Sequence, residues 1–248
     1  MRRGCVLAAI VCALLIGRGS GCHAQSPYEL DVGRELLLVG GGVGSNIASF
    51  LVPVDPDRLF QQAISRPITS IPAIDRSAAR KWSPRAHKAS NYLFVGALTA
   101  SFTGSALVYP KEPGVPLTIV GESFLISSGL TGVVKALVQR PRPYVYNDDV
   151  PDHIRHERDA FLSFWSGHAA NTAALSISSA MLIDRAEVDR TVRACAWVGA
   201  IALPALMAWL RVRAGRHFPT DVLAGCLVGG LTGLLVPYIH RPNSQSQP

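Results

Sequence analysis

The fold class is decided by two stretches near the C-terminus, WVGAIALPALMAWL (Trp197–Leu210) and LAGCLVGGLTGLLVPY (Leu223–Tyr238). Both are apolar on every helical face, whereas a helix on the surface of a soluble protein keeps one polar face. Several stretches approach the roughly 20 residues that cross a bilayer, and all contain the small residues at which spanning helices pack closely. The others are Leu36–Val54, Ala89–Pro110, Val115–Val138 and Ala160–Ile183. We therefore expect an all-α, membrane-embedded bundle of about five to six helices.

The composition of the chain agrees with this expectation. Of its 248 residues 48% are hydrophobic and only 17% are charged, whereas about 25% are charged in an ordinary soluble domain. This deficit indicates that much of the surface does not face water. The alternative is a soluble all-helical domain with a large core, because apolar runs shorter than about 18 residues do not by themselves establish spanning.

The net charge of +7 favours an anionic partner. Nucleic acid, anionic lipid headgroups and phosphorylated substrates all fit such an excess. No Lys/Arg run with interleaved aromatic residues is present, so we expect no nucleic-acid binding. The five cysteines follow neither a disulfide framework nor a zinc pattern. The sequence leaves the oligomeric state open.

The N-terminus has the layout of a secretory signal. Two arginines precede the apolar stretch Cys5–Ile16, and small residues lead to Ala24, after which we expect cleavage. Acylation of Cys22 is a weaker alternative because Gly19 stands where a large aliphatic residue is usual. A short uncleaved span is another alternative. The chain is thus expected to comprise a signal peptide (1–24), an N-terminal helix with a polar, basic interfacial segment (25–88), the main helical bundle (89–240) and a disordered tail (241–248).

Basic side chains end the third apolar stretch. Lys135 lies in its last turn, and Arg142 follows between Pro141 and Pro143, which stop the helix and keep the loop extended. An ammonium and a guanidinium group therefore emerge at the same boundary. Taken alone, such residues commonly cap helix carbonyls or meet lipid headgroups.

The triplet Ser166-Gly167-His168 opens the next helix. Ser166 is suited to the N-cap position, and the unpaired N–H groups of Gly167 and His168 would favour an anion at the helix end. Taken alone, the triplet would more often be a capped helix with an incidental histidine.

A third cluster joins the last two apolar stretches. His217 and Asp221 are four residues apart, the spacing that places side chains on one helix face, and Pro219 suits the first helical turn. Asp221 could accept the Nδ1 proton of His217 and leave the other ring nitrogen free to attack. Arg211 precedes the pair. Taken alone, such a pair is more often a local salt link.

Together the three clusters are far more specific. The spacings Lys-x6-Arg-Pro, Ser-Gly-His and Arg-x5-His-x3-Asp resemble the signature of the type 2 phosphatidic acid phosphatase superfamily, which includes bacterial nonspecific acid phosphatases and vanadium haloperoxidases. Nine positions match in order between Lys135 and Asp221. The chain departs from the usual pattern at Trp165, where the family has proline, and at Leu210, where it has serine.

The resemblance implies a chemistry for each matched residue. His217 would attack phosphorus to form a phosphohistidine, with Asp221 orienting it, and His168 would protonate the leaving oxygen and then activate water. No metal and no cofactor are expected. The phosphoryl oxygens would be held by Lys135, Arg142, Arg211 and the backbone near Ser166 and Gly167.

The expected function is metal-independent hydrolysis of a phosphate or diphosphate on a membrane lipid. The candidate substrates are phosphatidic acid, phosphatidylglycerophosphate, an isoprenoid diphosphate and the phosphates of lipid A. A secreted, soluble acid phosphatase of broad specificity is the alternative, followed by a non-catalytic protein that binds anionic lipid; a haloperoxidase fits less well. We expect a bacterial inner-membrane location. The site is expected to face the periplasm, because the glycine-rich Leu36–Val54 is a poor helix that need not span.

Two further features lie outside the motifs. Glu122 is the one acid inside the third apolar stretch, and such an acid usually faces the bundle interior, here in a structural hydrogen bond. His153 and His156 share a loop with Asp152 and Glu157, which could hold an ion. Solvated loop charges are the more common outcome.

Overall fold

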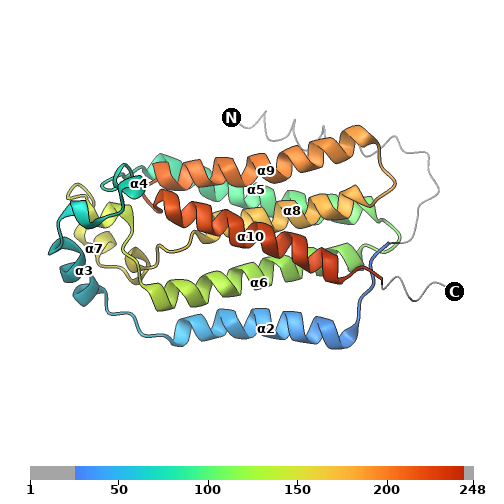
Figure 1. Cartoon of the computed structure of the whole chain (residues 1–248), viewed down its shortest axis with the longest axis horizontal. Coiled ribbons are helices and arrows are strands. Elements are labelled where there is room, and N and C mark those ends of the chain that lie inside the picture. The colour runs from blue at the N-terminus through green and yellow to red at the C-terminus, as the bar shows by residue number, and fades with distance from the viewer. Residues whose placement is uncertain (1–25, 243–248) are drawn as a thin grey trace.

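The computed structural model describes residues 26–242. Within that range six long helices form a bundle, a group of short helices covers one end of it, and no strand is present (Figure 1). The predicted all-α bundle is thereby confirmed. The expected signal peptide and the last residues of the expected tail, 243–248, lie outside the described residues. The long helices are α2 (Val32–Leu51), α5 (Pro84–Val108), α6 (Gly114–Val138), α8 (Gly167–Asp184), α9 (Arg190–Arg213) and α10 (Pro219–Ile239).

The short helices form a cap over the left-hand end of the bundle in Figure 1. Phe60, Tyr144 and Phe161 pack together in a buried apolar cluster between its two halves. The cap includes α3 (Pro56–Ile64), η1 (Ile68–Ser70) and α4 (Ala73–Arg76), which precede α5, and η2 (Pro143–Tyr146), α7 (Asp152–Arg155) and η3 (Arg158–Phe161), which follow α6.

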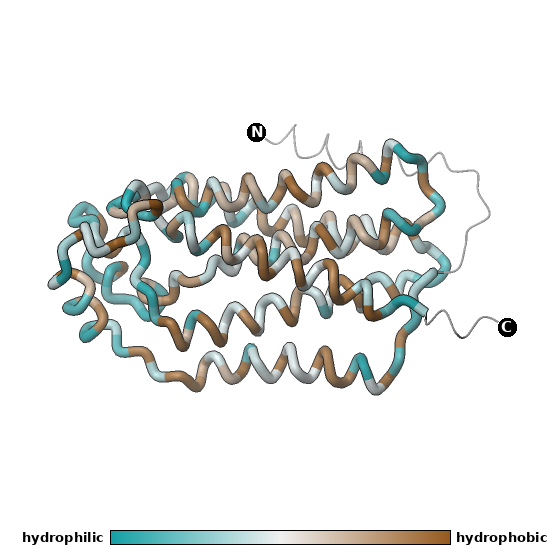
Figure 2. The backbone as a smooth tube through the Cα atoms, in the orientation of Figure 1, coloured by the Kyte–Doolittle hydropathy of each residue, from teal (hydrophilic) through white to brown (hydrophobic). Residues whose placement is uncertain are grey.

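Four helical segments are long and apolar enough to cross a membrane: α5, the stretch Gly114–Tyr146 that contains α6, α9 and α10. The pair α2 and α3, bent by 75°, is a fifth candidate if it is taken as one span. Leu223, Leu227 and Leu231 form a row along α10 with 56%, 69% and 58% of their surface exposed. Apolar residues lie along the length of the bundle (Figure 2). Such a row suits contact with acyl chains, and we treat the chain as a membrane protein.

Helix α8 lies inside the bundle and approaches α10 closely. A Cβ atom at Gly229 would lie 1.9 Å from the carbonyl oxygen of Ala170, and one at Gly225 would lie 2.6 Å from that of Ser166. Glycine at these positions lets the two backbones touch, as in other small-residue contacts between spanning helices. Because Ser166 opens α8, this contact also sets the distance between the second and third motifs.

The expectation that Leu36–Val54 is a poor helix is wrong. These residues belong mostly to α2, a continuous helix of 20 residues that runs beside α6 (Figure 1). A Cβ atom at Gly129 of α6 would lie 2.0 Å from the Ser45 hydroxyl oxygen. Glycine weakens an isolated helix, but here it permits close packing that outweighs propensity. The periplasmic expectation therefore loses the argument on which it was based.

Candidate active site

The three motifs meet at the capped end of the bundle, because four helix ends lie there (Figure 1). Lys135 lies in the last turn of α6, and Arg211 lies in the last turn of α9. His168 is in the first turn of α8, and His217 precedes α10 by two residues. Residues of all three motifs, although distant in the sequence, thus lie together at the capped end of the bundle.

His217 is buried, with 1% of its surface exposed, and its ring is held at both nitrogens. Its Nδ1 lies 2.8 Å from the carbonyl oxygen of Ser163, which can only accept a hydrogen bond, so Nδ1 carries the proton. Its Nε2 therefore presents a lone pair, 3.3 Å from Nη1 of Arg142. Burial, and then the positive charges of Arg142 and Lys135, lower the pKa of His217 well below 6.5. The unprotonated Nε2 is consequently the stable form.

The expected hydrogen bond from His217 to Asp221 is not formed. The nearest carboxylate oxygen of Asp221 lies 3.7 Å from Nδ1. That oxygen accepts instead from the Ser163 hydroxyl at 2.6 Å and from the Phe218 N–H at 2.9 Å. Asp221 thus fixes Ser163, whose carbonyl orients the imidazole. The carboxylate acts on His217 through one intervening residue and through its charge.

A buried ion-pair network that sequence reasoning missed supports Asp221. Arg140 reaches Asp221 at 2.5 Å with one nitrogen and Asp75 at 2.7 Å with another. Asp75, which is fully buried, belongs to α4 in the cap. The guanidinium carbon of Arg140 also lies 4.3 Å from the ring centre of Phe218. No pattern in the sequence links Asp75 to the motifs, although Arg140 lies within the first motif.

Arg142 is held rigidly beside His217. Its Nε and Nη2 donate to the backbone oxygen and carboxylate of Asp159, at 2.7 and 2.6 Å, and its Nη1 also donates to the backbone oxygen of Arg216. Burial raises the pKa of Asp159, but the charges of Arg142 and Lys135 outweigh it and leave the pKa below its ordinary value. Asp159 is therefore a charged anchor that aims the guanidinium, and sequence reasoning had not identified it.

His168 lies on the accessible side of this region. It is half-buried, and its Nε2 lies 3.1 Å from Oδ1 of Asn91 on α5. The Ser166 hydroxyl caps α8 by accepting from Ala169 N–H at 3.4 Å. The Ser166 N–H donates to the backbone oxygen of Asp221 at 2.9 Å, so it is not free for the expected phosphate contact. The N–H groups of Gly167 and His168 lie in the first turn, where no intrahelical acceptor exists.

The remaining two cations, Arg211 and Lys135, differ in the number of hydrogen bonds that hold their side chains. Arg211 is 3% exposed, and its Nη1 lies 3.1 Å from both the Ser90 hydroxyl and Nδ1 of His87 on α5. The ammonium group of Lys135 forms no hydrogen bond within residues 26–242, although the Lys135 backbone oxygen accepts from Gln139 N–H at 3.0 Å. A Cβ atom at Gly167 would lie 4.0 Å from its Cε, which places the lysine stem beside the start of α8. The Lys135 ammonium thus has no hydrogen-bond partner among the described residues, whereas Arg211 is held by two.

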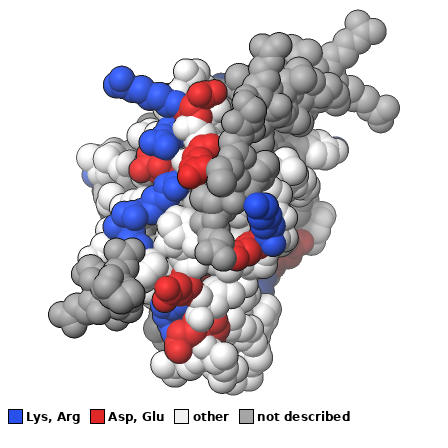
Figure 3. Space-filling view, turned by 90° about the vertical axis from the view of Figure 1, so that its right-hand side faces the viewer, with Lys and Arg blue, Asp and Glu red and all other residues white. Residues whose placement is uncertain are grey.

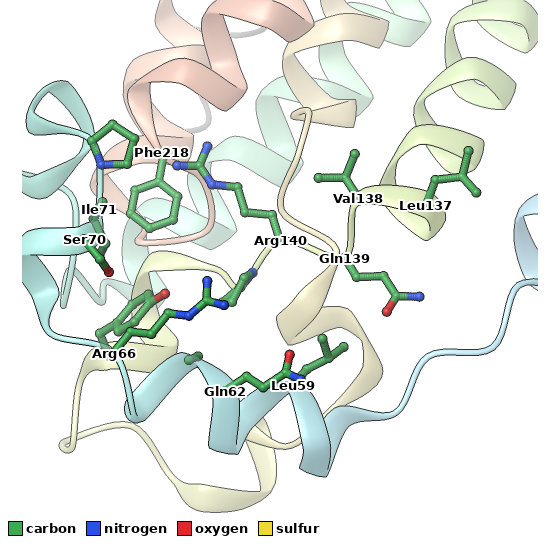
Figure 4. A pocket seen from close by; sticks show the side chains of 14 residues that line it. Leu59, Gln62, Arg66, Ser70, Ile71, Leu137, Val138, Gln139, Arg140 and Phe218 are labelled. Atoms are coloured by element: carbon green, nitrogen blue, oxygen red, sulfur yellow. The ribbon is translucent and has the colours of Figure 1, made fainter.

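A cavity of about 430 Å³ lies beside this region and not within it (Figure 4). Leu59, Arg66 and Phe218 are among its lining residues, and neither proposed catalytic histidine lines it. Arg140 takes part in both places, because its side chain lines the cavity and pairs with Asp221. The ion-pair network therefore separates the cavity from the histidines.

The comparisons with known proteins agree with the motif geometry. Residues 116–245, more than half of the chain, match the PAP2 superfamily. The chain belongs to the PAP2 superfamily. This PAP2 member is 31% identical over 121 residues to a lipid A 1-phosphatase of Rhizobium etli, an alignment that covers 47% of each protein. It thus spans about half the length of the curated relative. No solved structure matches this PAP2 protein.

Trp165, one of the two departures from the usual family pattern, has a structural role. Its indole N–H donates to the hydroxyl of Thr131 on α6, at 2.8 Å. Thr131 is one turn before Lys135, so the tryptophan ties the loop before α8 to the helix that carries the lysine. Nothing in the structure explains the leucine at position 210.

Proposed function

We propose that this PAP2 protein hydrolyses a phosphate ester or diphosphate of a membrane lipid through a phosphohistidine at Nε2 of His217. The observation that carries the proposal is the fixed tautomer of this ring. The Nδ1–H group donates a hydrogen bond to the Ser163 carbonyl oxygen, so the lone pair is on Nε2, beside the Arg142 guanidinium. A neutral imidazole held beside cations is suited to attack an anionic phosphorus centre.

In the first step, the Nε2 lone pair forms a bond to phosphorus and the bond to the lipid oxygen breaks. His168 gives a proton to the departing oxygen. Burial, and then the charges of Arg211 and Lys135, lower the pKa of His168 to about 2, so this step requires the bound phosphate anion to raise that pKa. In the second step, neutral His168 takes a proton from water, and the resulting hydroxide attacks phosphorus. The N–P bond breaks, inorganic phosphate leaves and His217 recovers its lone pair.

Arg142, Arg211 and Lys135 supply the positive charge that the transferred group needs. Phosphoryl transfer depends mainly on positioning and on neutralising the equatorial oxygens. Two guanidinium groups held by hydrogen bonds and the ammonium group of Lys135 meet this requirement. We therefore propose catalysis without a metal at this end of the bundle, with the N–H groups of Gly167 and His168 as further donors.

A lipid substrate is supported by the outer surface of the bundle. The exposed leucines of α10 begin just below Asp221, so a lipid headgroup can reach the region from the side. The name of the Rhizobium etli relative favours a phosphate of lipid A among the four candidate classes. We propose a bacterial inner-membrane location, and cysteine labelling around Asn147 in intact cells would show whether the site faces the periplasm.

The test is phosphate release from a panel of lipid A, phosphatidic acid, phosphatidylglycerophosphate and a prenyl diphosphate, in detergent with a metal chelator. We expect turnover of at least one lipid, and an acid-labile phosphoenzyme after rapid quenching. His217→Ala should abolish both signals, with folding checked by circular dichroism. Exclusive turnover of small soluble esters would favour the acid phosphatase alternative, and no turnover of any substrate would contradict the proposal.

A further inference from the structure

A second cluster of chemically active side chains lies at the opposite end of the bundle from the proposed active site. It comprises Glu35 in the first turn of α2, Glu122 of α6 and His240, which directly follows α10. One ligand atom from each lies within 4.8 Å of the others, and no other such group of three exists among residues 26–242. His153, which is exposed, and His156, which is half-buried, are not part of it.

The imidazole of His240 presents a lone pair to two carboxylates. Its Nδ1 lies 2.7 Å from the backbone oxygen of Val236, which can only accept, so Nδ1 carries the proton. In the neutral ring Nε2 is then an acceptor, and it lies 3.0 Å from Oε2 of Glu35 and 3.1 Å from Oε2 of Glu122. The contact with Glu35 has hydrogen-bond geometry, which requires a proton on Nε2; without that proton, three acceptor atoms face one another.

Glu122 provides an independent indication that a cation belongs here. It is 1% exposed, and as expected from the sequence it faces the bundle interior. The expected structural hydrogen bond is not formed, because neither carboxylate oxygen accepts a hydrogen bond among the described residues. The 3.1 Å contact with His240 lacks hydrogen-bond geometry. A buried carboxylate without partners is costly, and one proton on His240 could serve only one of the two acids.

We propose that Glu35, Glu122 and His240 bind one divalent transition-metal ion of the zinc class. Ligand atoms about 2.0–2.1 Å from a tetrahedral zinc stand roughly 3.3–3.4 Å apart, close to the 3.0 and 3.1 Å found around Nε2. Metal-bound histidines usually donate their other ring N–H to a carbonyl or carboxylate, which fixes the ring orientation. The hydrogen bond from Nδ1–H to the Val236 carbonyl oxygen has this role in His240. An imidazole in the ligand set favours zinc over calcium and magnesium. Water would complete the coordination.

The surroundings offer a polar approach for an ion. A cavity of about 510 Å³ at this end is lined by residues that flank the cluster in sequence, including Arg34, Ile239 and Arg241. Arg34 pairs with Glu35 at 2.9 Å and donates to the backbone oxygen of Ile239 at 2.8 Å. Figure 3 shows acidic and basic side chains side by side on this face. An ion can thus arrive from water, although Glu122 itself is buried.

The three ligands come from three helices, so the ion would join α2, α6 and α10. Among the described long helices, α2 packs mainly against α6, and the ion would add a second link between its first turn and the end of α10, beside the hydrogen bond from Arg34 to the Ile239 backbone oxygen. His217 precedes the start of α10 and His240 follows its end, so the cluster lies one helix length away from His217. We therefore assign the ion to stability and not to phosphoryl transfer.

The test uses the full-length, untagged protein in detergent, dialysed against metal-free buffer. Elemental analysis should find roughly one zinc per chain after loading, and added zinc should raise the thermal midpoint. Cobalt should give the visible absorption of a tetrahedral site. Glu122→Gln, which is close in shape, should weaken zinc binding by at least about tenfold. Glu187→Gln changes an exposed acid on the α8–α9 connection and should leave zinc binding unchanged.

Cobalt titration of the wild-type protein keeps the proposal testable if Glu122→Gln does not fold. Wild-type protein that retains no zinc and gives no cobalt spectrum would overturn the proposal and favour an imidazolium between two carboxylates. Zinc binding that survives both Glu122→Gln and His240→Gln would also overturn it. Lipid phosphatase activity is not a readout in any of these experiments, so their outcome is independent of the proposed function.

Discussion

The carboxylate of Asp75 accepts two hydrogen bonds from Thr220, one from its backbone N–H at 3.0 Å and one from its hydroxyl at 2.7 Å. Thr220 is the second residue of α10. An acid from the polar cap segment, far earlier in the sequence, therefore fixes the start of the helix that carries Asp221. Asp75 is also joined to Asp221 through Arg140, which pairs with both carboxylates. The cap is thus part of the framework of the proposed site.

Replacing Asp75 tests this relationship. Asp75→Ala leaves the Thr220 N–H and one side of Arg140 without an acceptor in a buried place, and should lower the free energy of unfolding by about 3 kcal/mol. Turnover should fall as well, because Asp221 loses its support. Thermal unfolding in detergent and phosphate release are the measurements. The control is Asp148→Ala, which removes a 99% exposed partner of Arg155. Equal midpoints for the two variants would contradict the prediction.

The pH dependence of kcat/KM should reflect the lowered pKa of His217. Protonation of Nε2 removes the nucleophile, so a lowered pKa keeps the ring active when the pH falls from about 7.5 to 6, a range in which an ordinary histidine becomes charged. Arg142→Gln removes one of the charges that depress the pKa. Its kcat/KM should therefore decline over this range relative to the wild-type protein.

The ratio of the two profiles, measured on one lipid, cancels the titration of the substrate phosphate. A ratio that stays constant between these pH values would argue against His217 as the titrating nucleophile. A residual activity too low to measure in Arg142→Gln can be avoided by using Lys135→Met, which removes the second charge that lowers the same pKa.

Ser163 should act as a positioning residue, because its hydroxyl holds Asp221 and its carbonyl holds His217. Ser163→Ala removes the hydroxyl and keeps the carbonyl. The loss of a hydrogen bond to a charged group should lower kcat by about tenfold to a hundredfold, with little change in KM. Asp221→Asn combined with Ser163→Ala should cost less than the sum of the single changes. Independent, additive effects would show that the two residues are not coupled.

The contact between α8 and α10 should be intolerant of any added atom. Gly229→Ala adds a Cβ atom only 1.9 Å from the Ala170 carbonyl oxygen, which is far too close for two non-bonded atoms. The helices must then separate, which should lower stability by about 1–3 kcal/mol and reduce turnover by moving His168 away from His217. Gly199→Ala on α9 is the matched control, since nothing lies within 4 Å of its Cβ position. A stable and fully active Gly229→Ala would refute this account of the packing.

The sequence predicted the helical bundle and the meeting of the three motifs, because both depend on patterns that survive in one dimension. Long apolar runs specify spanning helices, and the ordered spacings of Lys135, His168 and His217 specify a known arrangement. The cations and imidazoles also lie at helix ends. Glycine, proline and serine mark such ends in a sequence, so their positions could be predicted.

The contacts that aim those groups were not predictable in the same way. Asp75 and Asp159 act across long sequence separations, and nothing in their neighbours distinguishes them from solvated acids. The role of Ser163 depends on a backbone carbonyl, which every residue has. Helix α2 was misjudged because the effect of its glycines depends on a partner helix. In α2 the glycines lower the stability of the isolated helix but allow close packing against α6, which stabilises it in the bundle.

The gathering of all proposed reactive groups at one end of the bundle has a consequence for the cell. Under the proposed function, only headgroups in the leaflet nearest His217 would be dephosphorylated, while identical lipids in the other leaflet lie a full bilayer thickness away. Hydrolysis of the whole lipid pool would then be limited by transbilayer movement, and a flippase would control it as much as this protein does.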